Sequence, residues 1–175
     1  MANYKELVPF VLCYEGGFVN SPTDRGGATN KGVTIATWRA FCAKKGKPAT
    51  IKTLKAMTQS EWEEIFKTMY WDKCKADCIN DQAIASALVD FAWHSGVTTA
   101  VKKIQQIVKA PIDGIVGPLT LKAINEYRPP RGLFGLLQAS RFSYIMDVVT
   151  AHPEQKKYFK GWLRRIDALS YDKLS

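Results

Sequence analysis

The segment between residues 15 and 34 constrains the fold more than any other part of the chain. The run before it, Tyr4 to Tyr14, carries apolar residues at helical spacing, namely Leu7, Val8, Val11 and Tyr14. The run stops at Glu15, and Gly16 and Gly17 follow, which we expect to end the helix in the left-handed cap conformation that glycine adopts without steric cost. A polar, glycine-rich stretch then predicts turns instead of a second helix.

Glu15 is the sharpest candidate for chemistry in this segment. An acid in the last turn of a helix faces the negative end of the helix dipole, which favours the protonated form of its carboxyl group. A general acid needs that property, because it must still hold a proton near neutral pH. The alternative is a solvated carboxylate at a frayed helix end.

Asp24 supplies a second acid nine positions later. Glycoside hydrolysis uses two carboxyl groups, one to donate a proton and one to stabilise or activate the attack. The surrounding Pro-Thr-Asp-Arg-Gly-Gly is also a good turn, in which Asp commonly bonds the backbone. The hydroxyls of Thr29 and Thr34 would orient a water or close a hairpin, and the sequence leaves both alternatives open.

Several motifs resemble those of one family. The run from Glu15 to Thr34 reads Glu-Gly-Gly-Phe-Val-Asn-x-x-x-Asp-x-Gly-Gly-x-Thr-Asn-x-Gly-Val-Thr and resembles the signature of glycoside hydrolase family 108, the N-acetylmuramidases of bacteria and phages. Residues 88–96 resemble its central helix, residues 113–120 the turn of its C-terminal predicted peptidoglycan-binding region, and residues 159–165 its closing helix. The resemblance covers nearly the whole chain and implies a lysozyme-like helical fold.

A second resemblance is to the phage-lysozyme pattern Glu-x8-Asp-x5-Thr. Glu15 and Asp24 match it, but the third position is Asn30, with Thr29 one place early, which leaves the role of Thr29 open. Within the family pattern, Phe18 stands where Tyr is common and His94 where Asn is common.

The family resemblance implies hydrolysis of the β-1,4 bond between N-acetylmuramic acid and N-acetylglucosamine, with Glu15 as catalytic acid. Asp24 would stabilise the transition state or position a water with Thr29 or Thr34. Aromatic rings can stack on sugars and polar side chains can hydrogen-bond them, so the further sugar-binding candidates are Asn20, Thr34, Tyr70, Trp71, Trp93, His94 and Ser95. The alternative for the aromatic residues is a place in the core, which is usual for aromatics at helical spacing. The alternatives are a lytic transglycosylase, a non-catalytic wall-binding module and a secretion-activating protein.

The expected fold is mainly α, a lysozyme-like helical domain with a small β-hairpin next to Glu15. We expect one domain over residues 1–175, with the catalytic motif in 1–77 and a helical part, similar to the predicted peptidoglycan-binding domain, in 78–175. Strand candidates lie near residues 18–19 and 32–33. The first two helices predicted after the hairpin are 37–45 and a helix that the capping box at 58–61 opens. The next helix begins at a cap, Asn80 or Asp81, and ends at Gly96, and another runs from Thr98 or Thr99 to Val108. The last three predicted helices start at Pro118, span 133–151 and lie around 162–169.

The formal charge of +9 indicates a polyanionic partner. Peptidoglycan fits, and nucleic acid is the competing reading. The basic residues form short pairs without a nucleic-acid motif, so we expect no nucleic acid and a solvated face at each pair: Lys44-Lys45, Lys102-Lys103, Lys156-Lys157 and Arg164-Arg165.

Cys13, Cys42, Cys74 and Cys78 have no zinc-type spacing and only two histidines accompany them, so we expect free, mostly buried thiols, no metal and no cofactor. No run approaches the roughly 18 apolar residues of a membrane span. The first residues lack the pattern of a secretory signal. We therefore expect a monomer made in the cytoplasm that acts on the wall, in the periplasm or outside the cell, after release by a holin, an exporter or host lysis.

Overall fold

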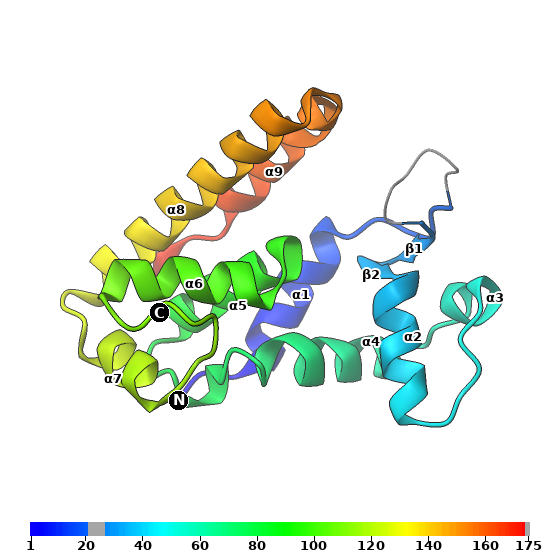
Figure 1. Ribbon diagram of the computed structural model, residues 1–175, viewed down its shortest axis with the longest axis horizontal. Coiled ribbons are helices and arrows are strands. Elements are labelled where there is room, and N and C mark those ends of the chain that lie inside the picture. The colour runs from blue at the N-terminus through cyan, green and yellow to red at the C-terminus, as the bar shows by residue number, and fades with distance from the viewer. Residues whose placement is uncertain (21–26, 174–175) are drawn as a thin grey trace. The chain divides into compact units, whose positions relative to one another are not determined.

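The structure, a computed structural model, describes residues 1–20 and 27–173 and is mainly helical, as predicted. The α-helices are α1 (Tyr4–Tyr14), α2 (Ile35–Lys44), α3 (Ile51–Lys55), α4 (Gln59–Phe66), α5 (Gln82–Ser95), α6 (Val97–Val108), α7 (Pro118–Glu126), α8 (Pro130–Ala151) and α9 (Phe159–Ala168). Two short strands, β1 (Thr29–Asn30) and β2 (Val33–Thr34), form an antiparallel hairpin. Figure 1 labels these elements along the chain.

Tighter and wider helical turns connect the α-helices. They are the π-helix η1 (Lys67–Trp71) and the 3-10 helices η2 (Ala76–Cys78), η3 (Pro153–Tyr158) and η4 (Tyr171–Lys173). Within the described ranges, no helix is both long and apolar enough to span a bilayer.

The chain forms two compact units. The hairpin unit comprises Val8–Thr68, and the helical unit comprises Met1–Leu7 together with Met69–Ser175. Helix α1 therefore contributes its first turn to the helical unit and its remainder to the hairpin unit.

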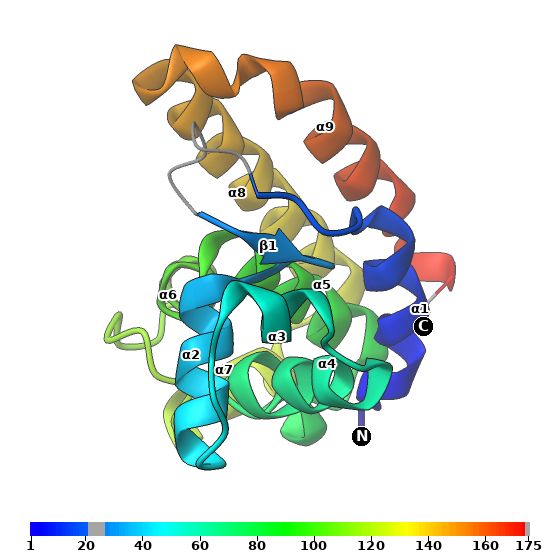
Figure 2. The same ribbon diagram turned by 90° about the vertical axis from the view of Figure 1, so that its right-hand side faces the viewer.

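In the hairpin unit, α2 and α3 pack on each other and on the strands β2 and β1 (Figure 2). Trp62 and Phe66 on α4 are fully buried and stack with their ring centroids 5.3 Å apart. The predicted capping box opens α4: the Thr58 hydroxyl accepts from the N–H of Glu61, and the Glu61 carboxylate accepts from the N–H of Thr58. This reciprocal pairing fixes where the helix begins.

In the helical unit, α5 forms the centre, and all its residues from Ala83 to Trp93 are buried. Asp81 caps it by accepting from the N–H of Ile84, and the chain reverses at Gly96, whose φ of 83° favours glycine. Helix α6 packs along α5, α8 packs on both, and α9 runs along α8 (Figure 1).

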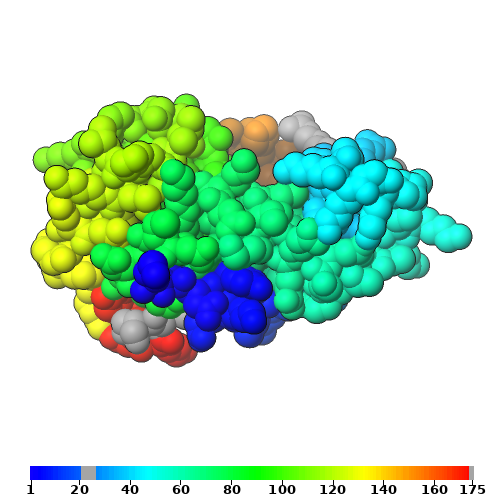
Figure 3. Space-filling model, turned by 90° about the horizontal axis from the view of Figure 1, so that it is seen from below, coloured from blue at the N-terminus to red at the C-terminus, as the bar shows by residue number. Residues whose placement is uncertain are grey.

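The start of the chain packs in the same unit. The N–H of Ala2 donates to the Ile79 carbonyl at 3.1 Å and that of Asn3 to the Gln82 side chain at 2.7 Å. Figure 3 shows these first residues, in blue, lying against the green segment that precedes and begins α5.

Two expectations about local structure were wrong. Neither Gly16 nor Gly17 adopts a positive φ, so α1 ends at Tyr14 without a left-handed glycine cap. The four cysteines are free, but Cys13 and Cys78 are exposed and only Cys42 and Cys74 are buried. Burial raises the pKa of the Cys74 thiol to about 12, which keeps it protonated.

Candidate functional site

Glu15 immediately follows α1 and is half-buried. Its N–H donates to the Leu12 carbonyl at 3.3 Å, which extends the last turn by one residue. Val11, one turn earlier, is fully buried and anchors this end of the helix in its unit. Gly16 and Gly17 are exposed, and a Cβ built on either would meet no atom of residues 1–20 and 27–173 within 4 Å. The backbone beside Glu15 is thus open, which leaves room for a ligand.

Thr29 lies between two backbone partners. It forms an antiparallel bridge with Val19, with both hydrogen bonds at 2.8 Å, and it pairs with Thr34 in the hairpin. The hairpin turns at Lys31 and Gly32, with φ of 47° and 77°. The Val19 bridge ties the segment that leaves Glu15 to the hairpin, so a small hairpin follows this acid along the chain as predicted. Its strands differ from the predicted ones, because β1 (29–30) pairs with β2 (33–34) and residues 18–19 contribute only the isolated bridge.

The predicted polar residues of this unit have different surroundings. The Thr34 hydroxyl caps α2 by accepting from the N–H of Thr37 at 3.1 Å, which gives it a structural role. The half-buried Thr29 hydroxyl is 3.5 Å from the Gly27 carbonyl, a long contact. Asn20 is exposed. Asp24 lies outside the described residues.

In the helical unit the structure reveals a buried charge cluster that the sequence analysis missed. Asp90 on α5 is fully buried and accepts from Arg165 on α9 at 2.6 Å, while Nη1 of Arg141 on α8 lies 2.7 Å from its other oxygen. Burial alone would raise the pKa of Asp90, but the two guanidinium charges hold that pKa well below its usual range. The cluster ties three helices together through one carboxylate.

The prediction that each basic pair lies on a solvated face was wrong for Arg165. Arg164 is exposed as expected, but Arg165 is only 2% exposed. A signal was present on the partner side: Asp90 is the one acid in the apolar run from Ala83 to Trp93. A charge at a core position of a helix requires a buried partner.

His94 extends this cluster toward solvent. Its Nδ1 lies 3.1 Å from Nη2 of Arg141, and the residue as a whole is exposed. Burial of part of the ring and the positive charges of Arg165 and Arg141 lower the pKa of His94 to about 3. His94 is therefore a neutral imidazole at pH 7.

The other candidates on and near α5 are less open. Trp93 is 9% exposed and packs on Tyr70 with centroids 4.6 Å apart. The Ser95 hydroxyl donates to the Phe91 carbonyl at 2.9 Å within the helix. Trp71 is fully buried and donates to Asp77, so the idea that it stacks on sugar was wrong.

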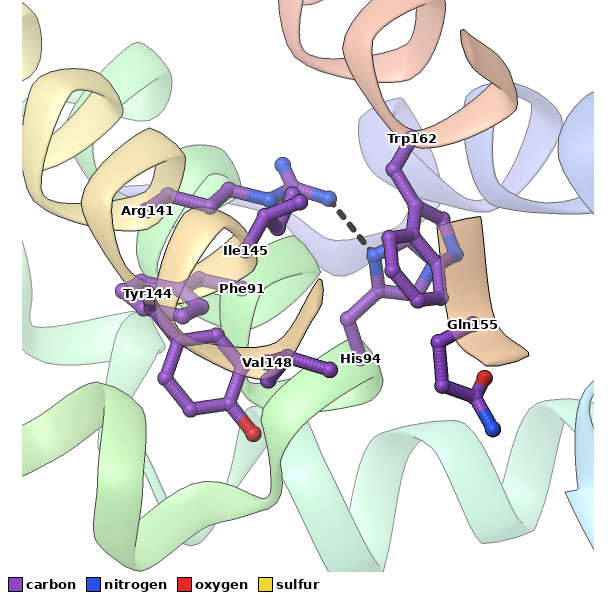
Figure 4. Close-up of a pocket in the computed structure, with 8 residues that line it drawn as sticks. All are labelled: Phe91, His94, Arg141, Tyr144, Ile145, Val148, Gln155 and Trp162. Carbon is purple, nitrogen blue, oxygen red and sulfur yellow. Dashed lines mark hydrogen bonds between the residues drawn. The ribbon is translucent and has the colours of Figure 1, made fainter. Parts of the chain in front are cut away.

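A pocket of about 170 Å³ lies beside His94 within the helical unit. Figure 4 shows its lining residues, which come from α5, α8, η3 and α9: Phe91, His94, Arg141, Tyr144, Ile145, Val148, Gln155 and Trp162. Of these, only His94 is predicted from the sequence as a candidate site residue. Phe91 and Trp162 lie in the segments that resemble the family's central and closing helices, whereas the lining residues on α8 and η3 carry no motif.

Two stretches of the chain match models of known protein families, and a solved structure resembles nearly the whole chain. Residues 8–96 match the model of the family described as glycosyl hydrolase 108, and residues 99–167 match a predicted peptidoglycan domain. The solved structure of Brucella abortus SagA is 31% identical, with a TM-score of 0.81 over 95% of this chain and 90% of that one. No functionally curated protein matches the chain.

Proposed function

Because this chain belongs to the glycosyl hydrolase 108 family, we propose that it is a peptidoglycan hydrolase that cleaves the β-1,4 bond between N-acetylmuramic acid and N-acetylglucosamine. The observation that carries the proposal is the place of Glu15: a half-buried acid, directly after α1, with open glycine backbone beside it. The match of residues 99–167 to a predicted peptidoglycan domain supports the same substrate.

In this proposal Glu15 donates its proton to the glycosidic oxygen as the C1–O bond breaks, so that the leaving sugar departs as a neutral alcohol. The positive charge that develops at C1 and the ring oxygen is stabilised by Asp24, or a water positioned by Asp24 with Thr29 attacks C1. Retaining and inverting outcomes follow from the separation of the two carboxyl groups, about 5–5.5 Å or roughly 6.5–9.5 Å.

The remaining sugar contacts are assigned by their exposure. Asn20 is exposed beside the bridge at Val19, and His94 is exposed on α5. Thr34 in the hairpin unit, and Trp93 and Ser95 in the helical unit, already have structural partners, so we propose that each supports the sugar contacts of its own unit. The excess of basic residues favours association with an anionic wall.

The test is clearance of purified peptidoglycan by the wild-type protein and by Glu15→Gln, with mass spectrometry of the released fragments. Clearance by the wild type alone, with reducing muramic acid ends, is the expected result. Anhydro-muramyl ends would instead make the protein a lytic transglycosylase. Equal clearance by both proteins would move the chemistry away from Glu15, and binding of sacculi without clearance by either would make it a wall-binding module.

A further inference from the structure

The pocket beside His94 has the composition of a site for a small, mostly neutral group. Its walls are largely apolar, with Phe91, Ile145 and Val148 among them, and His94 and Gln155 add polar groups at its margin. Pockets that bind small molecules commonly combine apolar walls with a few placed polar groups. The volume of about 170 Å³ suits one substituent of a sugar rather than a chain of sugars.

Arg141 fixes which nitrogen of His94 carries the proton. A guanidinium has donors only, so the contact of Arg141 Nη2 with Nδ1 at 3.1 Å requires that Nδ1 accept. The proton of the neutral ring then lies on Nε2, across the ring from Arg141. Arg141 is 1% exposed and paired with Asp90, so it is held in place. His94 thereby presents an oriented N–H donor.

We propose that this pocket binds the N-acetyl group of an amino sugar, with the Nε2–H of His94 donating to the acetyl carbonyl oxygen. The Gln155 side-chain oxygen accepts from the acetamido N–H, and the methyl group contacts Ile145 and Val148. This inference rests on the proposed function for its ligand class, since peptidoglycan glycans carry an N-acetyl group on each sugar.

Charge argues against a carboxylate as the occupant. The Arg141 charge is already shared with Asp90 and nearly closed to solvent, and the neutral His94 offers no positive charge. A stem-peptide amide next to an alanine methyl has the same chemistry as an acetamido group. The sugar is favoured because Tyr144 and Trp162 are half-exposed at the pocket and give flat aromatic surfaces for a pyranose ring.

The first experiment separates these sources by titrating the full-length Glu15→Gln protein, followed by NMR signals of the His94 imidazole and the Trp162 indole. The three ligands are chitotetraose, cellotetraose, which has hydroxyls in place of the acetamido groups, and the L-Ala-γ-D-Glu stem dipeptide. Chitotetraose should shift both signals, with at least tenfold tighter binding than cellotetraose. Equal affinity for the two sugars, shifts produced by the dipeptide instead, or no shift with chitotetraose would each overturn the proposal.

Two variants of His94 test the donor itself. His94→Asn keeps an acceptor near the Nδ1 position for Arg141 but removes the donor at Nε2, whereas His94→Gln places an amide N–H near Nε2. His94→Asn should weaken chitotetraose binding about tenfold, which is about 1.4 kcal/mol, and should leave cellotetraose unchanged. His94→Gln should retain most of the affinity. If His94 had a structural role alone, the substitution would weaken the binding of both ligands equally. If His94→Asn bound chitotetraose as tightly as the wild type, His94 would not be the donor to the acetyl group.

The outcome is separable from that of the proposed function. Clearance of sacculi by the wild type without acetamido selectivity would overturn only the pocket assignment. Acetamido selectivity in a protein that does not clear sacculi would overturn the hydrolase proposal and leave the pocket assignment standing.

Discussion

In the hairpin unit several polar side chains are held by backbone groups, whereas in the helical unit charged side chains hold one another. Asn30 donates to the Leu54 carbonyl, Trp62 to the Lys31 carbonyl, and Thr34 accepts from the N–H of Thr37. Asp90, in contrast, binds Arg165 from 75 residues away in sequence.

The difference separates two kinds of constraint. The backbone-held groups shape the hairpin unit, which carries Glu15, through hydrogen bonds to main-chain atoms. The Asp90 cluster is removed from water and must remain paired, because an unpaired charge in such a place is costly. Substitutions should therefore affect activity in the first region and stability in the second.

The largest expected effect is on stability at Asp90. Asp90→Asn would leave Arg141 and Arg165 without their shared carboxylate and should lower the free energy of unfolding by about 3–5 kcal/mol. Urea unfolding measures this directly. Asp147→Asn, an exposed acid on α8, is the matched control and should change it by less than about 0.5 kcal/mol. Similar midpoints for the two variants would contradict the claim that the buried Asp90 must remain paired with its two arginines.

The same contrast explains what could be read from the sequence. The motif from Glu15 to Thr34, the Thr58 capping box and the reversal at Gly96 use partners close in sequence, and the structure confirms the cap and the reversal. The Arg165 partnership joins α5 to α9. Helical spacing places Arg165, three residues after Trp162 and four before Leu169, closer to the apolar face than Arg164, but it does not identify Asp90 as the partner. The prediction of a glycine cap after α1 was wrong, because neither Gly16 nor Gly17 adopts the left-handed conformation that such a cap requires.

A smaller effect is expected at Gln105, which organises the loop before α7. Its fully buried amide donates to Asp113, to the Ile115 carbonyl and to Thr120, and its oxygen accepts from the N–H of Gly114. Gln105→Ala should cost about 2–3 kcal/mol, because several groups lose partners in a buried place. Gln106→Ala, at the exposed neighbour, is the control.

Hydrogen exchange gives this prediction a local readout. The amide of Gly114 should exchange faster in Gln105→Ala, while amides of the hairpin unit should keep their protection. Unchanged exchange at Gly114 would show that the loop is held by something other than Gln105.

Glycines offer a milder comparison of the two units. Gly114 has a φ of 79°, and a Cβ there would lie 2.8 Å from the Thr98 methyl carbon. Gly114→Ala should therefore destabilise by about 1–2 kcal/mol. In Gly16→Ala the new methyl group meets no atom within 4 Å in the described part of the chain and needs no unusual φ, so thermal unfolding should barely change. If Gly16→Ala proved the more damaging, the segment after Glu15 would be more constrained than its open backbone indicates.

The smallest expected effect is the contribution of His94 to pH dependence. Its pKa is about 3 in the folded protein and about 6.5 in an unfolded chain, so between these values the unfolded state binds more protons. Stability should consequently fall as the pH drops from about 6.5 toward 3. Solvent reaches the ring, so we expect a loss of no more than about 1 kcal/mol between pH 7 and pH 5.

His94→Asn, which cannot titrate, isolates this contribution when both proteins are unfolded in urea at the two pH values. Asp90 does not affect the comparison, because its lowered pKa keeps it ionised between pH 7 and pH 5. The stability that its ionised form contributes is lost only as the pH falls below about 4. The variant should lose less stability than the wild type between pH 7 and pH 5. An equal loss would mean that His94 titrates alike in both states, and that Arg141 does not hold the ring in its neutral form.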